Sequence, residues 1–152
     1  MASKDRVLAR GPGEGKTLSV GGNKIIFKAV KEETEGAYGL LEYTAAPKFA
    51  GPPRHIHRHT EEGFYLLEGE LTFRVGESTI HASAGAFVLI PRGAVHTFAN
   101  PGSKPARCLV LLSPGGFEKF FEELAKVAAT SGYPPPLEVR KYLSSKYDQE
   151  YV

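Results

Sequence analysis

A regular series of short apolar runs between residues 54 and 116 restricts the fold of this chain more than any other feature. Each run ends at a glycine, proline or asparagine turn, and the runs are Gly63–Glu68, Leu71–Val75, Thr79–Ala82, Phe87–Ile90, Val95–Ala99 and Ala106–Leu112. Short strands separated by regular turns are typical of β-sandwiches and barrels. Two earlier runs, Lys16–Val20 and Asn23–Val30, flank the turn pair Gly21-Gly22 and extend the pattern. We therefore predict a mainly β fold with a barrel over residues 16–114.

The hydrophobic period changes after residue 116. Phe117, Phe120, Phe121 and Leu124 recur at a spacing of three and four residues, which predicts an amphipathic helix over Phe117–Ala129. A second, shorter helix is expected over Leu137–Tyr147, after a proline-rich break. We expect both helices to pack outside the barrel as a C-terminal helical extension of residues 115–152, with the phenylalanine stripe serving as core. Residues 1–15 are polar and glycine-rich and are expected to form an N-terminal arm.

Length and composition narrow the functional classes. The 152 residues suit one domain, and the net charge of +2, without a run of five basic residues, argues against a nucleic-acid partner. No apolar stretch reaches about 18 residues, which argues against a membrane span, and the N-terminus lacks the pattern of a signal peptide. We therefore expect a cytoplasmic location. The single cysteine, Cys108, rules out an internal disulfide.

Histidine spacing suggests a metal site. His55 and His57 alternate, so a strand would point both imidazoles to one face, and a turn could return the carboxylate of Glu62 to the same point. His96 follows the turn formed by Pro91 and Gly93 and supplies a fourth candidate ligand from another strand. Three imidazoles and one carboxylate suit one divalent transition metal per chain, with Fe, Mn, Ni, Co, Cu and Zn all open.

The neighbours of these ligands define an expected pocket. His59 continues the alternation from His57; we expect it at the pocket rim, and direct contact with the metal stays open. Phe64 shares a strand face with Glu62 and is expected in the pocket wall. Phe49, Phe73 and Phe98 are candidates to line a pocket for a flat aromatic ligand, although core packing is the expected role of at least two of them.

The same residues carry a resemblance to a known family. Gly51, His55, His57, Glu62 and Gly69 resemble the first cupin motif, although only three residues separate Gly51 from His55 where the family has five. The second cupin motif is matched at every signature position, by Gly85, Pro91, Gly93, His96 and Asn100. The runs 63–71 and 113–118 resemble the corresponding segments of single-domain quercetin-dioxygenase-like cupins. The resemblance implies a double-stranded β-helix, the jelly-roll barrel of cupins, with a metal pocket inside, and usually a homodimer.

For function, the resemblance implies a metal-dependent dioxygenase that acts on a flavonoid-like or other small aromatic or enolic compound. Glu62 would then be a ligand that also acts as a general base. Two alternatives stay open, because one fold hosts many functions. One is an isomerase or epimerase of a small polar metabolite, which a pocket rich in lysine, arginine and tyrosine would favour. The other is a non-catalytic module that binds a small ligand.

Overall fold

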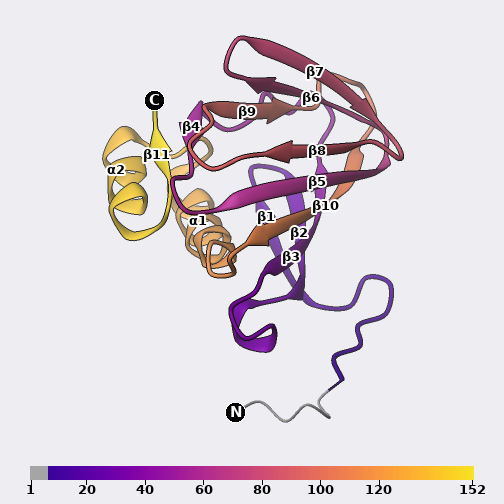
Figure 1. The fold of residues 1–152 in the computed structure, drawn as a ribbon. Helices are drawn as coiled ribbons and strands as arrows, with labels where there is room; N and C mark the ends of the chain where they lie inside the picture. Colours follow the sequence, from indigo (N-terminus) through magenta and orange to yellow (C-terminus); the bar gives the residue numbers. More distant parts are fainter. Residues whose placement is uncertain (1–6) are drawn as a thin grey trace.

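The computed structural model describes residues 7–152, which form two antiparallel sheets facing each other with two helices at one end (Figure 1). The larger sheet has the order β1-β2-β3-β10-β5-β8 and the smaller the order β11-β4-β9-β6-β7. In the larger sheet the strands are β1 Lys16–Val20, β2 Asn23–Ala29, β3 Gly39–Ala45, β10 Ala106–Ser113, β5 Glu61–Glu68 and β8 Phe87–Ile90. In the smaller they are β11 Glu150–Tyr151, β4 His55–Ile56, β9 His96–Ala99, β6 Glu70–Val75 and β7 Ser78–Ser83. The predicted mainly β fold, a jelly-roll barrel of antiparallel strands followed by helices, is confirmed.

Alternation along the strands builds the core between the sheets. In β6, Leu71 and Phe73 are buried while Thr72 and Arg74 face outwards. The central strand β10 buries every second residue from Ala106 to Leu112 in the same way. Burial of each large apolar side chain contributes about 1.5–3 kcal/mol to stability. A slip of one residue in register would turn all of these side chains towards solvent and lose their contributions together. Cys108 belongs to this core, and its burial raises the pKa of the thiol to about 12, which makes it inert.

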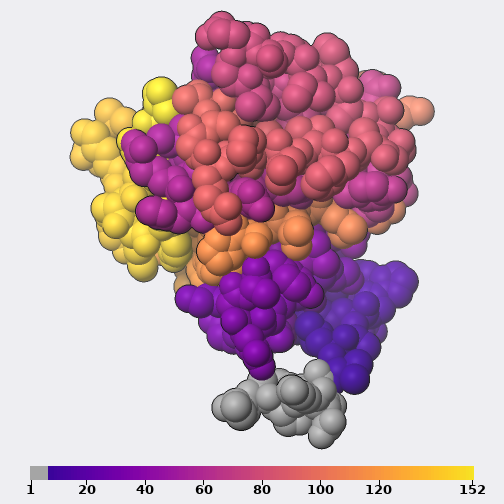
Figure 2. Space-filling model, viewed as in Figure 1, coloured from indigo at the N-terminus to yellow at the C-terminus, as the bar shows by residue number. Residues whose placement is uncertain are grey.

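Both predicted helices are present, as α1 Glu118–Ser131 and α2 Leu137–Lys146. The buried carboxylate of Glu118 fixes the start of α1, because it accepts hydrogen bonds from the backbone N–H groups of Lys31 (2.6 Å) and Gly116 (2.7 Å). Gly39 lies against this carboxylate, where a Cβ atom would approach Oε2 to 2.6 Å. Figure 2 shows the C-terminal segment, in yellow, covering one end of the barrel.

Both ends of the described chain are tied to the barrel. Near the N-terminus, Arg10 forms an ion pair with Glu33 (2.7 Å), and Lys28 of β2 donates to the carbonyls of Gly11 and Glu14. The rest of the predicted arm, residues 1–6, lies outside the described residues. At the other end the chain forms β11, a strand of two residues that has no periodic signal in the sequence and pairs with β4. A short 3-10 helix, Lys31–Glu33, links β2 to β3, and within residues 7–152 no helix is long and apolar enough to cross a membrane.

Candidate metal centre and its pocket

Four side chains able to ligate a metal meet between the two sheets, at the end of the barrel that the helices cover. His55 lies in β4 and pairs with His96 at the start of β9, while Glu62 reaches in from β5 of the other sheet. His57 follows β4 directly. One ligand atom from each of these four residues lies within 4.8 Å of the others, and all four residues are at most 5% exposed. The structure therefore brings the four predicted ligands into one buried cluster that could hold a metal ion.

Backbone carbonyls orient the three imidazoles. The Nδ1 atoms of His55, His57 and His96 lie 2.7, 2.6 and 2.9 Å from the carbonyl oxygens of Pro53, Asp148 and Ala94 respectively. A carbonyl only accepts, so each Nδ1 carries the proton and donates it, and each Nε2 is left with a free lone pair. The same arrangement orients histidine ligands in metalloproteins, where the partner of the outer nitrogen fixes the ring.

The inner atoms of the cluster need a positive charge among them. Nε2 of His96 lies 2.9 Å from Oε2 of Glu62, and with Nδ1 protonated both atoms are acceptors. Nε2 of His57 lies 3.4 Å from the same oxygen and, among residues 7–152, has no hydrogen-bond partner although it is buried. A proton or a metal ion relieves this repulsion, and neutral imidazoles with a carboxylate are the donors that divalent transition metals prefer. The residues present therefore fit a metal ion.

The pKa values of the cluster reflect burial and mutual charge. Burial raises the pKa of Glu62, but the charges and hydrogen bonds of His57 and His96 outweigh it and hold this pKa well below its usual range. Burial lowers the pKa of His57, yet Glu62 and then Asp148 bring it above its ordinary value. Burial, reinforced by the charge of His96, lowers the pKa of His55 to about 4. The carboxylate thus stays ionised and His55 stays neutral at neutral pH.

These values predict that the metal-free protein loses stability as the pH falls below 6.5. The unfolded chain protonates His55 at its ordinary pKa of 6.5, whereas the folded chain takes up this proton only near pH 4, so acidification across this window favours unfolding. The gap corresponds to about 3 kcal/mol. The raised pKa of His57 affects stability above pH 6.5 instead. Protonation of His57 stabilises the folded chain increasingly as the pH falls towards 6.5, and this contribution is complete below pH 6.5. Urea unfolding with a chelator present, from pH 8 to 4, measures the profile.

His55→Gln removes the group that titrates and serves as the control. The fall in unfolding free energy between pH 6.5 and 4.5 should be shallower in this variant than in the wild type. A wild-type profile that stays level over this window would contradict the assignment of a buried, neutral His55.

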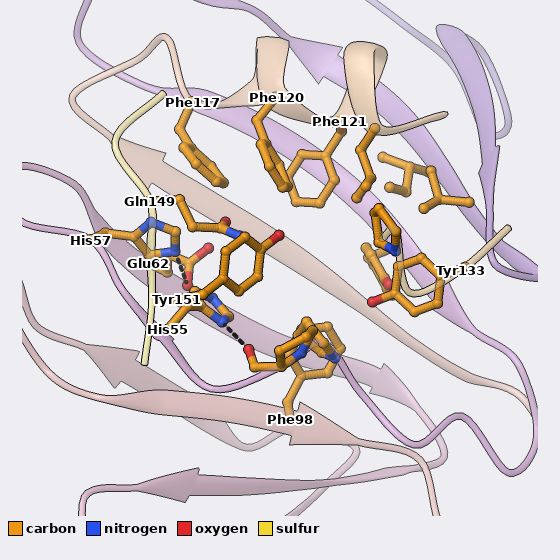
Figure 3. A pocket seen from close by; sticks show the side chains of 17 residues that line it. His55, His57, Glu62, Phe98, Phe117, Phe120, Phe121, Tyr133, Gln149 and Tyr151 are labelled. Carbon is orange, nitrogen blue, oxygen red and sulfur yellow. Dashed lines mark hydrogen bonds and ion pairs between the residues drawn. The ribbon is translucent and has the colours of Figure 1, made fainter. Parts of the chain in front are cut away.

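An aromatic pocket of about 50 Å³ opens beside the cluster. Figure 3 shows Phe117, directly before α1, and Phe120 and Phe121 of α1 on one side, and Tyr151 and Gln149 in front of the histidines. The complete lining is Val20, Ile25, Tyr43, Pro52, Pro53, His55, His57, Glu62, Phe98, Phe117, Phe120, Phe121, Leu124, Tyr133, Pro135, Gln149 and Tyr151. No lysine or arginine occurs in this lining, as far as the described residues extend. The pocket therefore suits an uncharged ligand with a planar apolar face.

Of the phenylalanines predicted to line a pocket, only Phe98 does so within residues 7–152. Phe64 and Phe73 are almost completely buried behind it, with the ring of Phe64 5.5 Å from that of Phe98. Phe49 is buried too, beside the rings of Phe98 and Tyr133. Phe64, expected in the pocket wall, is buried in the core in this structure. The reason is depth: it shares a strand face with Glu62 but lies one pleat further into the barrel.

His59 lies apart from the cluster and is exposed. Its backbone N–H donates to the carboxylate of Asp148 (2.9 Å), and its carbonyl accepts from Nε of Arg92 (2.8 Å). It lines an open surface hollow with Ile56, Tyr147 and Asp148 instead of the aromatic pocket. The alternation that suggested its place beside His57 ends where β4 ends, at Ile56.

Sequence reasoning did not anticipate the contributions of α1 and of the C-terminus to this pocket. The ring of Phe117 lies 4.5 Å from that of His57, so the stripe interpreted as core also borders the candidate ligands. The three-and-four spacing was the available signal, but it cannot distinguish a packed face from a pocket wall. Gln149 and Tyr151 had no signal, because the strand that positions them has two residues.

Comparisons with known proteins agree with this geometry. A family model described as "Cupin domain" matches residues 41–112. The chain is 30% identical over 112 residues to quercetin 2,3-dioxygenase from Bacillus subtilis and 32% identical over 81 residues to the tetracenomycin polyketide synthase protein TcmJ from Streptomyces glaucescens. These matches cover 74% and 53% of this chain but only 33% and 52% of the relatives.

A solved structure supports the fold. The crystal structure of a predicted oxalate decarboxylase from Thermotoga maritima superposes with a TM-score of 0.61 at 18% identity and covers 72% of this chain and 99% of that chain. At this identity the likeness concerns the fold alone.

Proposed function

The chain belongs to the cupin superfamily, with quercetin 2,3-dioxygenase among its relatives, and we propose that it is a metal-dependent dioxygenase. Its substrate would be a flavonoid-like or other small aromatic or enolic compound. The observation that carries the proposal is the largely aromatic pocket, with neither lysine nor arginine in its described lining, that opens directly onto the buried cluster of three histidines and one glutamate. The 30% identity to the dioxygenase, over 74% of this chain, supports the same reading.

In this proposal His55, His57, Glu62 and His96 hold one divalent transition metal ion. Four protein ligands would leave two positions of a six-coordinate ion, or one of a five-coordinate ion, for substrate or dioxygen. When bound, the ion supplies Lewis-acid polarisation of a substrate hydroxyl and redox chemistry with dioxygen. Three backbone carbonyls hold the imidazoles in the required tautomer, as described above, and the surrounding apolar side chains exclude water from the site.

The protein's own contributions follow from the pocket. Rings of Phe98, Phe117 and Phe121 would hold a flat substrate by offset or edge contacts. The Glu62 carboxylate would accept the proton of the substrate hydroxyl, which requires it to loosen from the ion. An isomerase or epimerase of a polar metabolite is less well supported: the described lining has three tyrosines, Tyr43, Tyr133 and Tyr151, but neither lysine nor arginine to hold a charged group.

Oxygen consumption tests the proposal. We expect chelator-treated protein reconstituted with Fe, Mn, Co, Ni or Cu to consume dioxygen in the presence of quercetin or a simpler catechol, with at least one metal. The matched control is the His96→Ala variant under the same conditions, which corrects for oxidation by free metal. Tight binding of the compounds without oxygen consumption by any metal form would instead favour the non-catalytic binding module.

A further inference from the structure

The last residues of the chain, 147–152, lie along the strand that carries the first ligand; we refer to them as the C-terminal strap. Glu150 pairs with Ile56 and Tyr151 pairs with His55 in an antiparallel ladder. The N–H of Val152 extends the ladder by donating to the carbonyl of Arg54 (2.9 Å). Figure 3 shows the strap running past the cluster, with Gln149 and Tyr151 projecting into the pocket. The strap therefore forms one wall of the pocket, directly in front of the histidines.

The strap also supplies the acceptor that orients one candidate ligand. His55 and His96 each donate Nδ1–H to a carbonyl two residues earlier in their own loop, so their orientation is local. Among the three candidate histidine ligands, only His57 depends on a distant segment: its Nδ1 donates to the carbonyl of Asp148, 91 residues away in sequence, at 2.6 Å. The tautomer and direction of His57 are therefore set by whether the strap is docked.

Side chains of the strap form hydrogen bonds and an ion pair with the loop that follows His57. The two carboxylate oxygens of Asp148 accept the backbone N–H groups of Arg58 (3.0 Å) and His59 (2.9 Å). Glu150 adds a two-point ion pair to Arg58, at 2.7 and 3.1 Å. These side chains of Arg58 and Glu150 are 59% and 55% exposed, so water competes for the ion pair and the anchor is weak.

We propose that the C-terminal strap is the positioning element of the metal site, with Asp148 as the positioning residue for His57. This inference rests on the proposed metal-binding function. Docking of the strap presents Nε2 of His57 to the ion and closes the pocket with Gln149 and Tyr151. A cavity of about 50 Å³ has room for only a few water molecules, so a substrate enters when a wall moves, and the strap is a wall whose ion-pair anchor is more than half exposed. Undocking of the strap would therefore open the pocket and, in the same movement, release His57 from the carbonyl of Asp148.

The test uses the full-length double variant Asp148→Ala with Glu150→Ala, which removes the side-chain anchors and leaves every ligand in place. The first readout is the tautomer of each histidine in the metal-free protein, from ¹⁵N NMR at a pH where the rings are neutral. In the wild type His55, His57 and His96 should all carry the proton on Nδ1. In the double variant His57 alone should shift towards the Nε2–H form, with His55 and His96 as internal controls, because only His57 uses the strap.

The second readout is cobalt(II) affinity, measured by competition with a chelator. Loss of the hydrogen-bond partner of a histidine ligand typically weakens metal binding about 10- to 100-fold. We expect a loss of cobalt affinity in this range, with an altered cobalt absorption spectrum. Glu138→Ala removes another exposed ion pair, to Lys141 in α2, and should change neither readout. Glu150→Arg, a milder variant that sets two like charges against each other, should shift both readouts in the same direction by a smaller amount.

These measurements distinguish a failure of the strap proposal from a failure of the proposed metal-binding function. The strap does not position the site if His57 keeps the Nδ1–H tautomer in the double variant. The same conclusion follows if the double variant binds cobalt with the affinity of the wild type. If the wild type binds no cobalt, the proposed metal-binding function fails, while the tautomer measurement still decides the role of the strap.

Discussion

Replacing His96 with alanine is expected to abolish stoichiometric metal binding. His96 is the most deeply buried of the four candidate ligands, 1% exposed, and its Nε2 lies 2.9 Å from the carboxylate of Glu62. Alanine leaves two imidazoles and one carboxylate around a space that no other described metal-ligating side chain reaches. We expect the metal content, measured by elemental analysis after loading and gel filtration, to fall from about one equivalent per chain to near zero.

Two other histidines provide matched controls. His81→Ala removes an exposed imidazole in β7 whose Nδ1 contacts the hydroxyl of Thr72, far from the cluster in the fold. His59→Ala removes the histidine nearest to the ligands in sequence. Both variants should bind metal as the wild type does. Unchanged metal content in His96→Ala would refute the assignment of the site, and loss of metal in His59→Ala would return that residue to the ligand set.

Most of the strands and both α-helices could be predicted because their signals are local. The runs separated by glycine and proline turns correspond to β5 to β10, usually within two residues at each end, since alternation and turn chemistry together determine a strand. The stripe of phenylalanines predicts α1 for the same reason. The grouping of His55, His57, Glu62 and His96 was also accessible, because their spacing within two turn-bounded motifs carries the information.

The pocket could not be predicted, because it depends on contacts between distant segments. Phe64 and Glu62 share a strand face, yet one is core and the other belongs to the cluster, and only the depth of the barrel separates them. The carbonyl of Asp148 has no side-chain signature, so its contact with His57 across 91 residues leaves no trace in the sequence pattern. Tyr151 enters the pocket through a two-residue strand that is too short to show a period.

The environment of Glu62 bears on the two roles proposed for its carboxylate, as ligand and as general base. Its pKa is held well below its usual range by His57 and His96, so it is ionised at any working pH and ready to bind a cation. A carboxylate with such a low pKa is a weak base towards an ordinary hydroxyl. In the proposed function a bound ion would acidify the substrate hydroxyl, and this would let the carboxylate accept the proton once it has loosened from the ion.

Glu62→Gln is therefore expected to lower oxygen consumption at least about 100-fold per bound metal ion, the usual contribution of a positioned general base. Glutamine keeps the size of the side chain and an oxygen able to ligate, but it has no charge and cannot accept a proton. The measurement is the initial rate of oxygen uptake with quercetin, divided by the metal content of the same sample, so that weaker metal binding does not count as lost catalysis.

Glu61→Gln makes the identical chemical change one residue earlier. Glu61 is half-buried and pairs with Arg92 at 3.4 Å on the outer side of β5, so its amide should leave both metal content and rate within about twofold of the wild type, as is usual for surface substitutions. A Glu62→Gln variant that retains the wild-type rate per bound metal would exclude proton transfer to this carboxylate. In that case the only role left for Glu62 is charge and coordination, and a loss of metal content alone would be its signature.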